Sequence, residues 1–109
     1  MKTDKERANR DQFFEALISL QSIDECYDFF EDIATGKELE AFIQRYQVAR
    51  RLMNGDTYET IEHETNARSS MVSRIKRCMN REGSGLRAVL VREMSSGAVT
   101  EQAAQRGRS

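Results

Sequence analysis

The sequence lacks several features, and each absence narrows the class of protein. Its 109 residues contain no proline, and runs of β-branched residues are few, which favours an all-helical fold. No stretch approaches the roughly 18 consecutive apolar residues that a membrane-spanning helix needs. The first residues are rich in charge and have no apolar core of the kind found in a signal peptide. We therefore expect a cytoplasmic protein with no membrane partner.

Residue types that carry catalysis or bind metals are also scarce. Cys26 and Cys78 lie far apart and outside any metal-ligand spacing, so we expect them to be small side chains on inner helix faces. The single histidine, His63, has no second ligand or nucleophile at a defined spacing, and a solvent-facing position suits it better. No glycine-rich loop has the strand and lysine of a phosphate-binding motif. We expect no enzyme activity, no catalytic residue and no metal.

Charge is segregated along the chain, although the formal net charge is only −1. Residues 1–40 hold 5 Lys and Arg against 11 Asp and Glu, a balance of −6. Residues 41–109 hold 12 against 7, a balance of +5. A chain that is nearly neutral overall can therefore still present a basic surface to nucleic acid.

Apolar residues recur at helical spacing in six segments, which predicts an all-α fold. These segments are residues 9–21, 22–33, 37–54, 58–64, 68–80 and 85–94. Gly36 suits the left-handed position that ends the second helix, and Asn54-Gly55 suits the end of the third. We expect a flexible arm at residues 1–8, a single helical domain at 9–95 and a disordered tail at 96–109.

The first two predicted helices have broad apolar faces. They carry four phenylalanines together with Leu17, Ile18, Ile23, Tyr27 and Ile33. The three short helices that follow cannot easily cover such faces, and exposing them would create a large apolar patch. We therefore predict that this half of the chain forms the interface of a homodimer.

Residues 57–80 fit a helix-turn-helix unit. Ile61 supplies the apolar residue of the first helix, and Asn66 tolerates the positive φ that the turn requires. A small residue, Ala67, follows the turn. The second helix needs inward-facing residues one turn apart, and these are Val72, Ile75 and Met79. Glu62 departs from the motif, because a small residue commonly stands there and lets the two helices approach.

The second helix of this unit has the chemistry of a DNA-reading helix. Residues 66–81 contain five positive side chains and no acid, whereas residues 56–64 contain four acids. Arginine and hydroxyl side chains in the first turns suit phosphates and base edges in the major groove. The candidate DNA-contacting residues are Arg68, Ser69, Ser70, Met71, Ser73, Arg74, Lys76 and Arg77. The alternatives are a basic surface helix without a nucleic-acid partner, or a dimeric adaptor whose basic helix docks on an acidic protein.

Three segments of the chain together resemble a known family. Residues 42–52 followed by Gly55, then residues 57–61, then residues 73–78, are similar to the Trp-repressor-like superfamily and its YerC/YecD-type branch. The resemblance covers about residues 10–95. It implies an intertwined all-helical homodimer that presents two recognition helices to a roughly palindromic operator. The function expected from it is that of a sequence-specific transcriptional regulator of double-stranded DNA.

The same resemblance bears on a small-molecule ligand. In relatives that bind tryptophan, two arginines sandwich the indole ring, and Arg45 and Arg74 occupy the matching positions. Those relatives have a glycine where this chain has Ile75, and a serine where it has Cys78. The candidate effector pocket is therefore Arg45, Arg74 and Cys78, with the bulk of Ile75 filling the indole slot. We expect ordinary phosphate-binding or salt-bridge arginines, no cofactor and no tryptophan corepressor.

Overall fold

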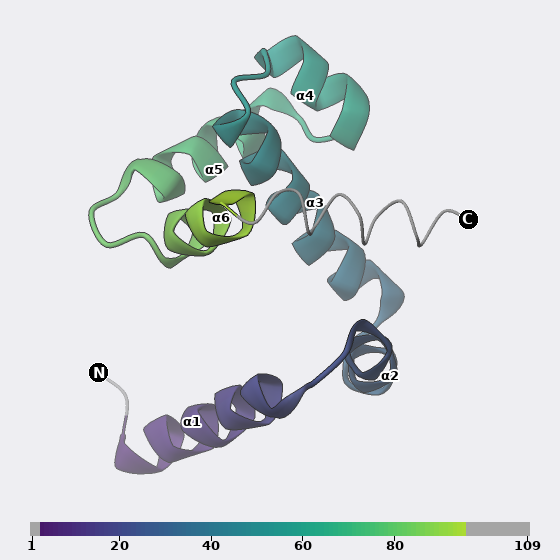
Figure 1. Ribbon diagram of the computed structural model, residues 1–109, viewed down its shortest axis with the longest axis vertical. Coiled ribbons are helices and arrows are strands. Elements are labelled where there is room, and N and C mark those ends of the chain that lie inside the picture. The colour runs from purple at the N-terminus through teal and green to yellow at the C-terminus, as the bar shows by residue number, and fades with distance from the viewer. Residues whose placement is uncertain (1–2, 96–109) are drawn as a thin grey trace. The chain divides into compact units, whose positions relative to one another are not determined.

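The computed structural model describes residues 3–95, which form six α-helices and no strand (Figure 1). The helices are α1 (Asp4–Ser19), α2 (Ile23–Ile33), α3 (Gly36–Met53), α4 (Tyr58–Thr65), α5 (Ser69–Asn80) and α6 (Gly85–Ser95). This confirms the all-α prediction. Within these residues, no helix combines the length and the apolar character that crossing a membrane requires. The tail predicted at residues 96–109 lies outside the described residues.

The first helix begins earlier than its apolar pattern indicates. It starts at Asp4, so residues 4–8 are helical and are not the flexible arm expected from their polarity. The cause is a capping box, in which the Thr3 hydroxyl accepts a hydrogen bond from the Glu6 backbone N–H. The Glu6 carboxylate in turn accepts one from the Thr3 backbone N–H. Both bonds satisfy donors that a bare helix end leaves unpaired.

The role predicted for Gly36 is also corrected. Gly36 is the first residue of α3 and does not end α2, and its φ is not positive. Thr35 caps α3, since its hydroxyl accepts from the Glu38 N–H at 3.1 Å and its own N–H donates to the Glu38 carboxylate at 2.8 Å. The backbone N–H of Thr35, which donates to the Glu38 carboxylate, is the main cause that lowers the pKa of Glu38 below its ordinary value, and the Thr35 side chain adds to the effect.

The prediction that α3 ends at Asn54-Gly55 is confirmed. Gly55 has a φ of 84°, and its N–H bonds to the Leu52 carbonyl while the Asp56 N–H bonds to the Arg51 carbonyl. This pair of bonds is the Schellman motif, which requires a left-handed residue at Gly55. Any residue with a Cβ would be strained there.

The chain divides into two compact units, Met1–Leu39 and Glu40–Ser109. In the first unit, neither α1 nor α2 buries a residue. The Phe13 and Phe29 rings of these two helices lie 6.1 Å apart between centroids. Two helices alone cannot enclose a core, which is why many apolar side chains of this unit are exposed and none is buried.

The second unit contains the buried core of the described residues. It draws on α3, α4, α5, α6 and the α4–α5 turn, and α5 contacts both α4 and α6 (Figure 1). The buried apolar residues are Val48, Ala49, Ile61, Ala67, Val72, Ile75, Met79 and Leu90. The predicted inward-facing residues of the helix-turn-helix unit are all among them.

Candidate nucleic-acid interface

The turn between α4 and α5 has the geometry predicted for a helix-turn-helix unit. Asn66 has φ 60° and ψ 14°, which is the left-handed conformation, and it is the only non-glycine residue with positive φ among residues 3–95. Thr65 secures the turn from within, because its hydroxyl donates to the Ile61 carbonyl at 2.6 Å and accepts from the Ala67 N–H at 3.2 Å.

A contact from α3 that the sequence did not predict holds the same turn. The Gln44 side-chain amide donates to the Thr65 carbonyl at 2.9 Å, across 21 residues of sequence. Helices α4 and α5 are thus positioned against α3 by a polar contact as well as by the core. No local pattern signals this bond, because it depends on how α3 and α4 cross.

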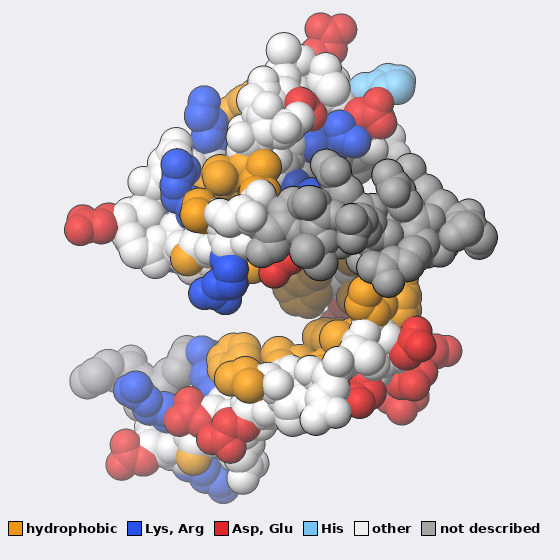
Figure 2. Space-filling view, in the orientation of Figure 1, with side chains coloured by type: hydrophobic (Ala, Val, Ile, Leu, Met, Phe, Trp, Pro, Cys, Tyr) orange, Lys and Arg blue, Asp and Glu red, His pale blue; other side chains and the backbone are white. Residues whose placement is uncertain are grey.

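The core packing determines which face of α5 points outward. Val72 and Ile75 are 0% and 6% exposed, so the opposite face meets solvent. Six of the eight predicted DNA-contacting residues are exposed, namely Arg68, Ser69, Ser70, Arg74, Lys76 and Arg77. Ser73 is half-buried, and Met71 is half-buried against the core, which suits it to support the helix. The blue Lys and Arg side chains over α5 are visible in Figure 2.

The N-terminus of α5 differs from those of the other described helices. Hydroxyl side chains cap the other five by accepting a backbone N–H, and these residues are Thr3, Ser22, Thr35, Thr57 and Ser84. The N-cap of α5 is Arg68, which makes no capping hydrogen bond with its side chain. Backbone donors in the first turn of α5 therefore remain available to an anion, beside an exposed arginine.

Acidic side chains near the helix-turn-helix residues pair with Arg51, which lies in the last turn of α3. Arg51 Nη1 lies 3.2 Å from Asp56 Oδ2, and Arg51 Nη2 lies 3.8 Å from Glu64 Oε2. The remaining ion pair among residues 3–95 is between His63 and Glu64, with His63 exposed as predicted. Sequence reasoning missed this Arg51 cluster, although an arginine in the last turn of a helix and five residues before an acid is a usable signal. No arginine or lysine of α5 is paired with an acid in the described part of the chain.

The candidate effector residues lie in different surroundings. Arg45 on α3 is half-buried, with its guanidinium carbon 5.6 Å from the Phe42 ring centroid and its Nε buried without a hydrogen-bond partner. Arg74 is exposed and Cys78 is half-buried, both on α5. Ile75 is part of the core. Three surface hollows of the second unit have linings that include none of these four residues.

A metal site is not assembled in this part of the molecule. Within residues 3–95, no three His, Cys, Asp or Glu side chains gather in a way that could hold a metal ion. The described residues present a basic helix whose first turn has no side-chain cap, next to the left-handed turn at Asn66. This geometry defines the helix-turn-helix class of DNA-binding proteins.

Comparisons with known proteins agree with this geometry. The family model described as Trp repressor protein matches residues 8–94. The YerC protein of Bacillus subtilis (strain 168) is 46% identical over 81 residues, covering 73% of this chain and 78% of its own length. The chain belongs to the Trp repressor family, as its resemblance predicted, and it is a DNA-binding regulator of that type, not an enzyme.

Two solved structures are similar to this chain. A TrpR-like protein from Eubacterium eligens has a TM-score of 0.71 at 39% identity, covering 75% of this chain and 84% of its own. A Trp repressor candidate from Staphylococcus aureus has a TM-score of 0.74 at 35% identity, covering 84% of this chain and 94% of its own. Both matches support the all-helical fold.

Proposed function

We propose that the protein is a sequence-specific transcriptional regulator that binds a roughly palindromic operator as a homodimer. The observation that carries this proposal is the outer face of α5. That face is basic and unpaired with acids in the described residues, and its first turn has no side-chain cap. Two copies of α5, one per protomer, would enter successive major grooves about 34 Å apart. A cytoplasmic location is part of this proposal, because a regulator must reach the DNA that it binds.

Exposed apolar side chains support the homodimer. In the first unit, Ile18 is 83% exposed and Ile23 is 68% exposed, and orange apolar side chains are visible on its surface in Figure 2. The second unit adds Phe42, Ile43, Val89, Val91 and Met94, all exposed. An isolated chain would leave these side chains in water, which a stable soluble monomer rarely does on this scale. A second copy of the chain would cover them.

The oligomeric state can be measured directly. Sedimentation velocity at micromolar concentration is expected to give a single species of twice the chain mass. Ile18→Asp is expected to shift that species toward monomer, because it places a charge in the predicted interface. The matched control is Arg10→Asp, since Arg10 is an exposed polar residue of the same helix. A wild-type monomer at that concentration would refute the homodimer.

Selection of bound sequences from a random duplex library, at near-physiological salt, tests the operator. Enrichment of a two-fold symmetric site, with half-sites about 10 base pairs apart, is the expected result. Affinity for that site should fall steeply with salt, with a logarithmic slope of about −0.9 per phosphate neutralised. No enrichment by a folded dimer would favour the alternative, an adaptor that docks its basic helix on an acidic protein.

We further propose that tryptophan is not a corepressor of this protein. Ile75 is in the core beside Arg74, and its branched side chain occupies the place where relatives that bind tryptophan have a glycine. Titration calorimetry with L-tryptophan is expected to show no saturable binding up to millimolar concentration. The variant Ile75→Gly tests the reason, although its folding must be confirmed by circular dichroism first. Micromolar binding by the wild-type protein would contradict this proposal.

A further inference from the structure

A hollow of about 500 Å³ lies beside the turn from α3 to α4, in the second unit. Its lining comes from the end of α3, the start of α4, the second half of α5 and the start of α6. Leu52, Met53 and Met79 supply apolar surface, and Tyr58 supplies an aromatic ring. The volume is within the range of small-molecule sites, which combine an apolar lining with a few polar groups.

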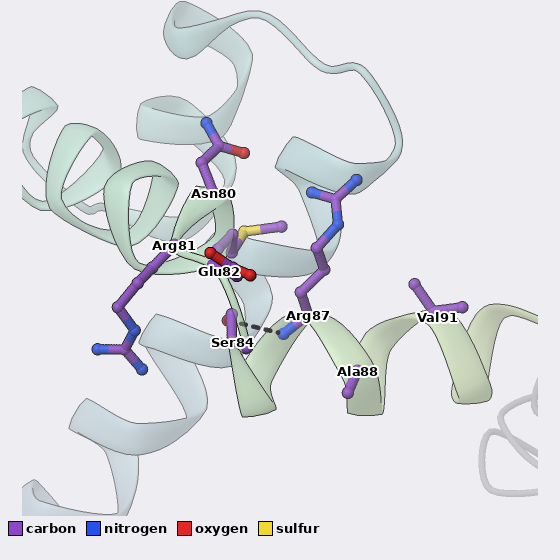
Figure 3. Close-up of a pocket in the computed structure, with 9 residues that line it drawn as sticks. Asn80, Arg81, Glu82, Ser84, Arg87, Ala88 and Val91 are labelled. Atoms are coloured by element: carbon purple, nitrogen blue, oxygen red, sulfur yellow. Dashed lines mark hydrogen bonds between the residues drawn. The ribbon is translucent and has the colours of Figure 1, made fainter.

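Two cations line this hollow. Lys76 Nζ lies 5.8 Å from the centroid of the Tyr58 ring, so the ring holds the ammonium at the wall of the hollow. Arg87, at the start of α6, also lines it, together with the amide of Asn80. Figure 3 draws a second hollow, whose lining shares Met79, Asn80 and Arg87 with this one, and there the Arg87 side chain extends from α6 in a direction away from that of Arg81. All three polar side chains can donate hydrogen bonds to an anion.

The acid in the lining does not cancel these charges. Asp56 Oδ2 accepts a hydrogen bond from Arg51 Nη1 at 3.2 Å, and Asp56 Oδ1 accepts one from the Asn54 amide at 3.1 Å. Both carboxylate oxygens of Asp56 are thus engaged outside the Lys76–Arg87 pair. The hollow therefore keeps a surplus of positive charge against an apolar and aromatic lining.

This hollow is separate from the candidate effector residues named above. Lys76 and Asn80 are one turn apart on α5, as are Arg74 and Cys78. Each residue of a helix is rotated by about 100° from the last, so the two pairs are separated by about 200° around α5. Arg74 and Cys78 consequently point away from the hollow, whereas Lys76, which is also a candidate DNA contact, lies on the hollow's side of α5.

We propose that the hollow binds a small organic phosphate, with the phosphate held by Lys76 and Arg87 and an apolar body against Tyr58, Met53 and Met79. Phosphate suits the site because its double negative charge matches the two cations, and arginine binds it through paired hydrogen bonds. The ligand would bridge α3, α4, α5 and α6. Resting on the proposed DNA-binding function, it would therefore bias the position of α5 and so regulate operator affinity.

The binding test uses phenyl phosphate as the probe, titrated into the full ¹⁵N-labelled chain. Saturable changes in the amide chemical shifts are expected for residues around the hollow. Phenol lacks the phosphate and inorganic phosphate lacks the ring, so each should bind at least about tenfold more weakly than phenyl phosphate. Arg87→Gln and Lys76→Gln should each weaken phenyl phosphate about tenfold. The matched control is Arg81→Gln, an exposed arginine on the same corner that does not line the hollow.

Three results would overturn the site. These are the absence of saturable shifts, shifts centred on Arg45, Arg74 and Cys78, and an equal loss of affinity in Arg81→Gln. A fourth result would assign the site to DNA. If the wild type does not bind phenyl phosphate and Arg87→Gln weakens DNA binding, a DNA phosphate occupies the hollow.

The proposed regulation is tested separately, by measuring operator affinity with and without the probe. Operator affinity of the wild type is expected to change at least threefold with saturating phenyl phosphate, and that of Arg87→Gln to stay constant. Unchanged operator affinity with saturable probe binding would remove the regulation and leave the site. Failure of the DNA-binding function itself would appear as no DNA binding at any probe concentration, with the probe titration unaffected.

Discussion

Replacing Arg68 and Arg74 together with alanine is expected to lower operator affinity by about 100-fold or more. Each arginine contact to a base edge or a phosphate is worth roughly 1–3 kcal/mol, and two lost contacts combine. Both side chains are exposed on α5, so the free energy of unfolding should change by no more than about 0.5 kcal/mol for each. Fluorescence anisotropy with the selected operator measures the affinity, and thermal unfolding measures the stability.

The control for this double variant is Arg92→Ala, which removes the same charge from an exposed position on α6. Its operator affinity should stay within about twofold of the wild type. Any small change would come from the long-range electrostatic attraction between the protein and DNA, which the lost charge weakens. If Arg68→Ala and Arg74→Ala each leave affinity unchanged, α5 is not the recognition helix.

A second substitution at Arg68 separates helix stability from DNA binding. Arg68→Ser would supply the hydroxyl cap that α5 lacks, as Ser22 does for α2. Such a cap stabilises a helix by about 1 kcal/mol. The variant should therefore be more stable than the wild type and yet bind the operator more weakly. A purely structural role for Arg68 predicts no loss of DNA affinity.

Ile61→Ala is expected to lower the free energy of unfolding by about 3 kcal/mol. Ile61 is fully buried where α4 packs against the core, and removing its methyl groups loses burial and leaves a cavity. This is a large share of the 5–15 kcal/mol that stabilises a typical domain. The turn at Asn66 would lose its support as well, since the Ile61 carbonyl accepts from the Thr65 hydroxyl beside it.

Urea unfolding at equal protein concentrations checks this value, because the stability of a dimer depends on concentration. Ile61→Val is the matched control and should cost about 0.5–1.5 kcal/mol, since it removes one methylene and keeps the branched shape. A loss below about 1 kcal/mol for Ile61→Ala would mean that the α4–core contact is not tightly packed.

Local signals in the sequence were sufficient to predict most of the helix-turn-helix unit. The spacing of Ile61, Val72 and Ile75 predicted the inward faces, and Asn66 predicted the left-handed turn. Both depend on short-range rules, namely helical periodicity and the steric limits on positive φ. The family resemblance extended this to the class of protein. The segregation of charge along the sequence points in the same direction.

Local sequence signals are less decisive where two of them compete. Gly36 suits the end of α2, yet Thr35 and Glu38 form a capping box that makes it the first residue of α3. Polarity suggested an arm at residues 1–8, whereas Thr3 and Glu6 start a helix there. In both places a side-chain cap outweighed composition, because a cap satisfies backbone donors that composition does not describe.

The sequence by itself therefore determined the helices, the turn at Asn66 and the basic character of α5. Tertiary structure decided what those elements bring together. Gln44 reaches the carbonyl of Thr65, and Lys76 and Arg87 meet at one hollow, although each pair is separated by many residues. Such contacts depend on how helices cross around a shared core, and crossing depends on the packing of side chains from several elements at once.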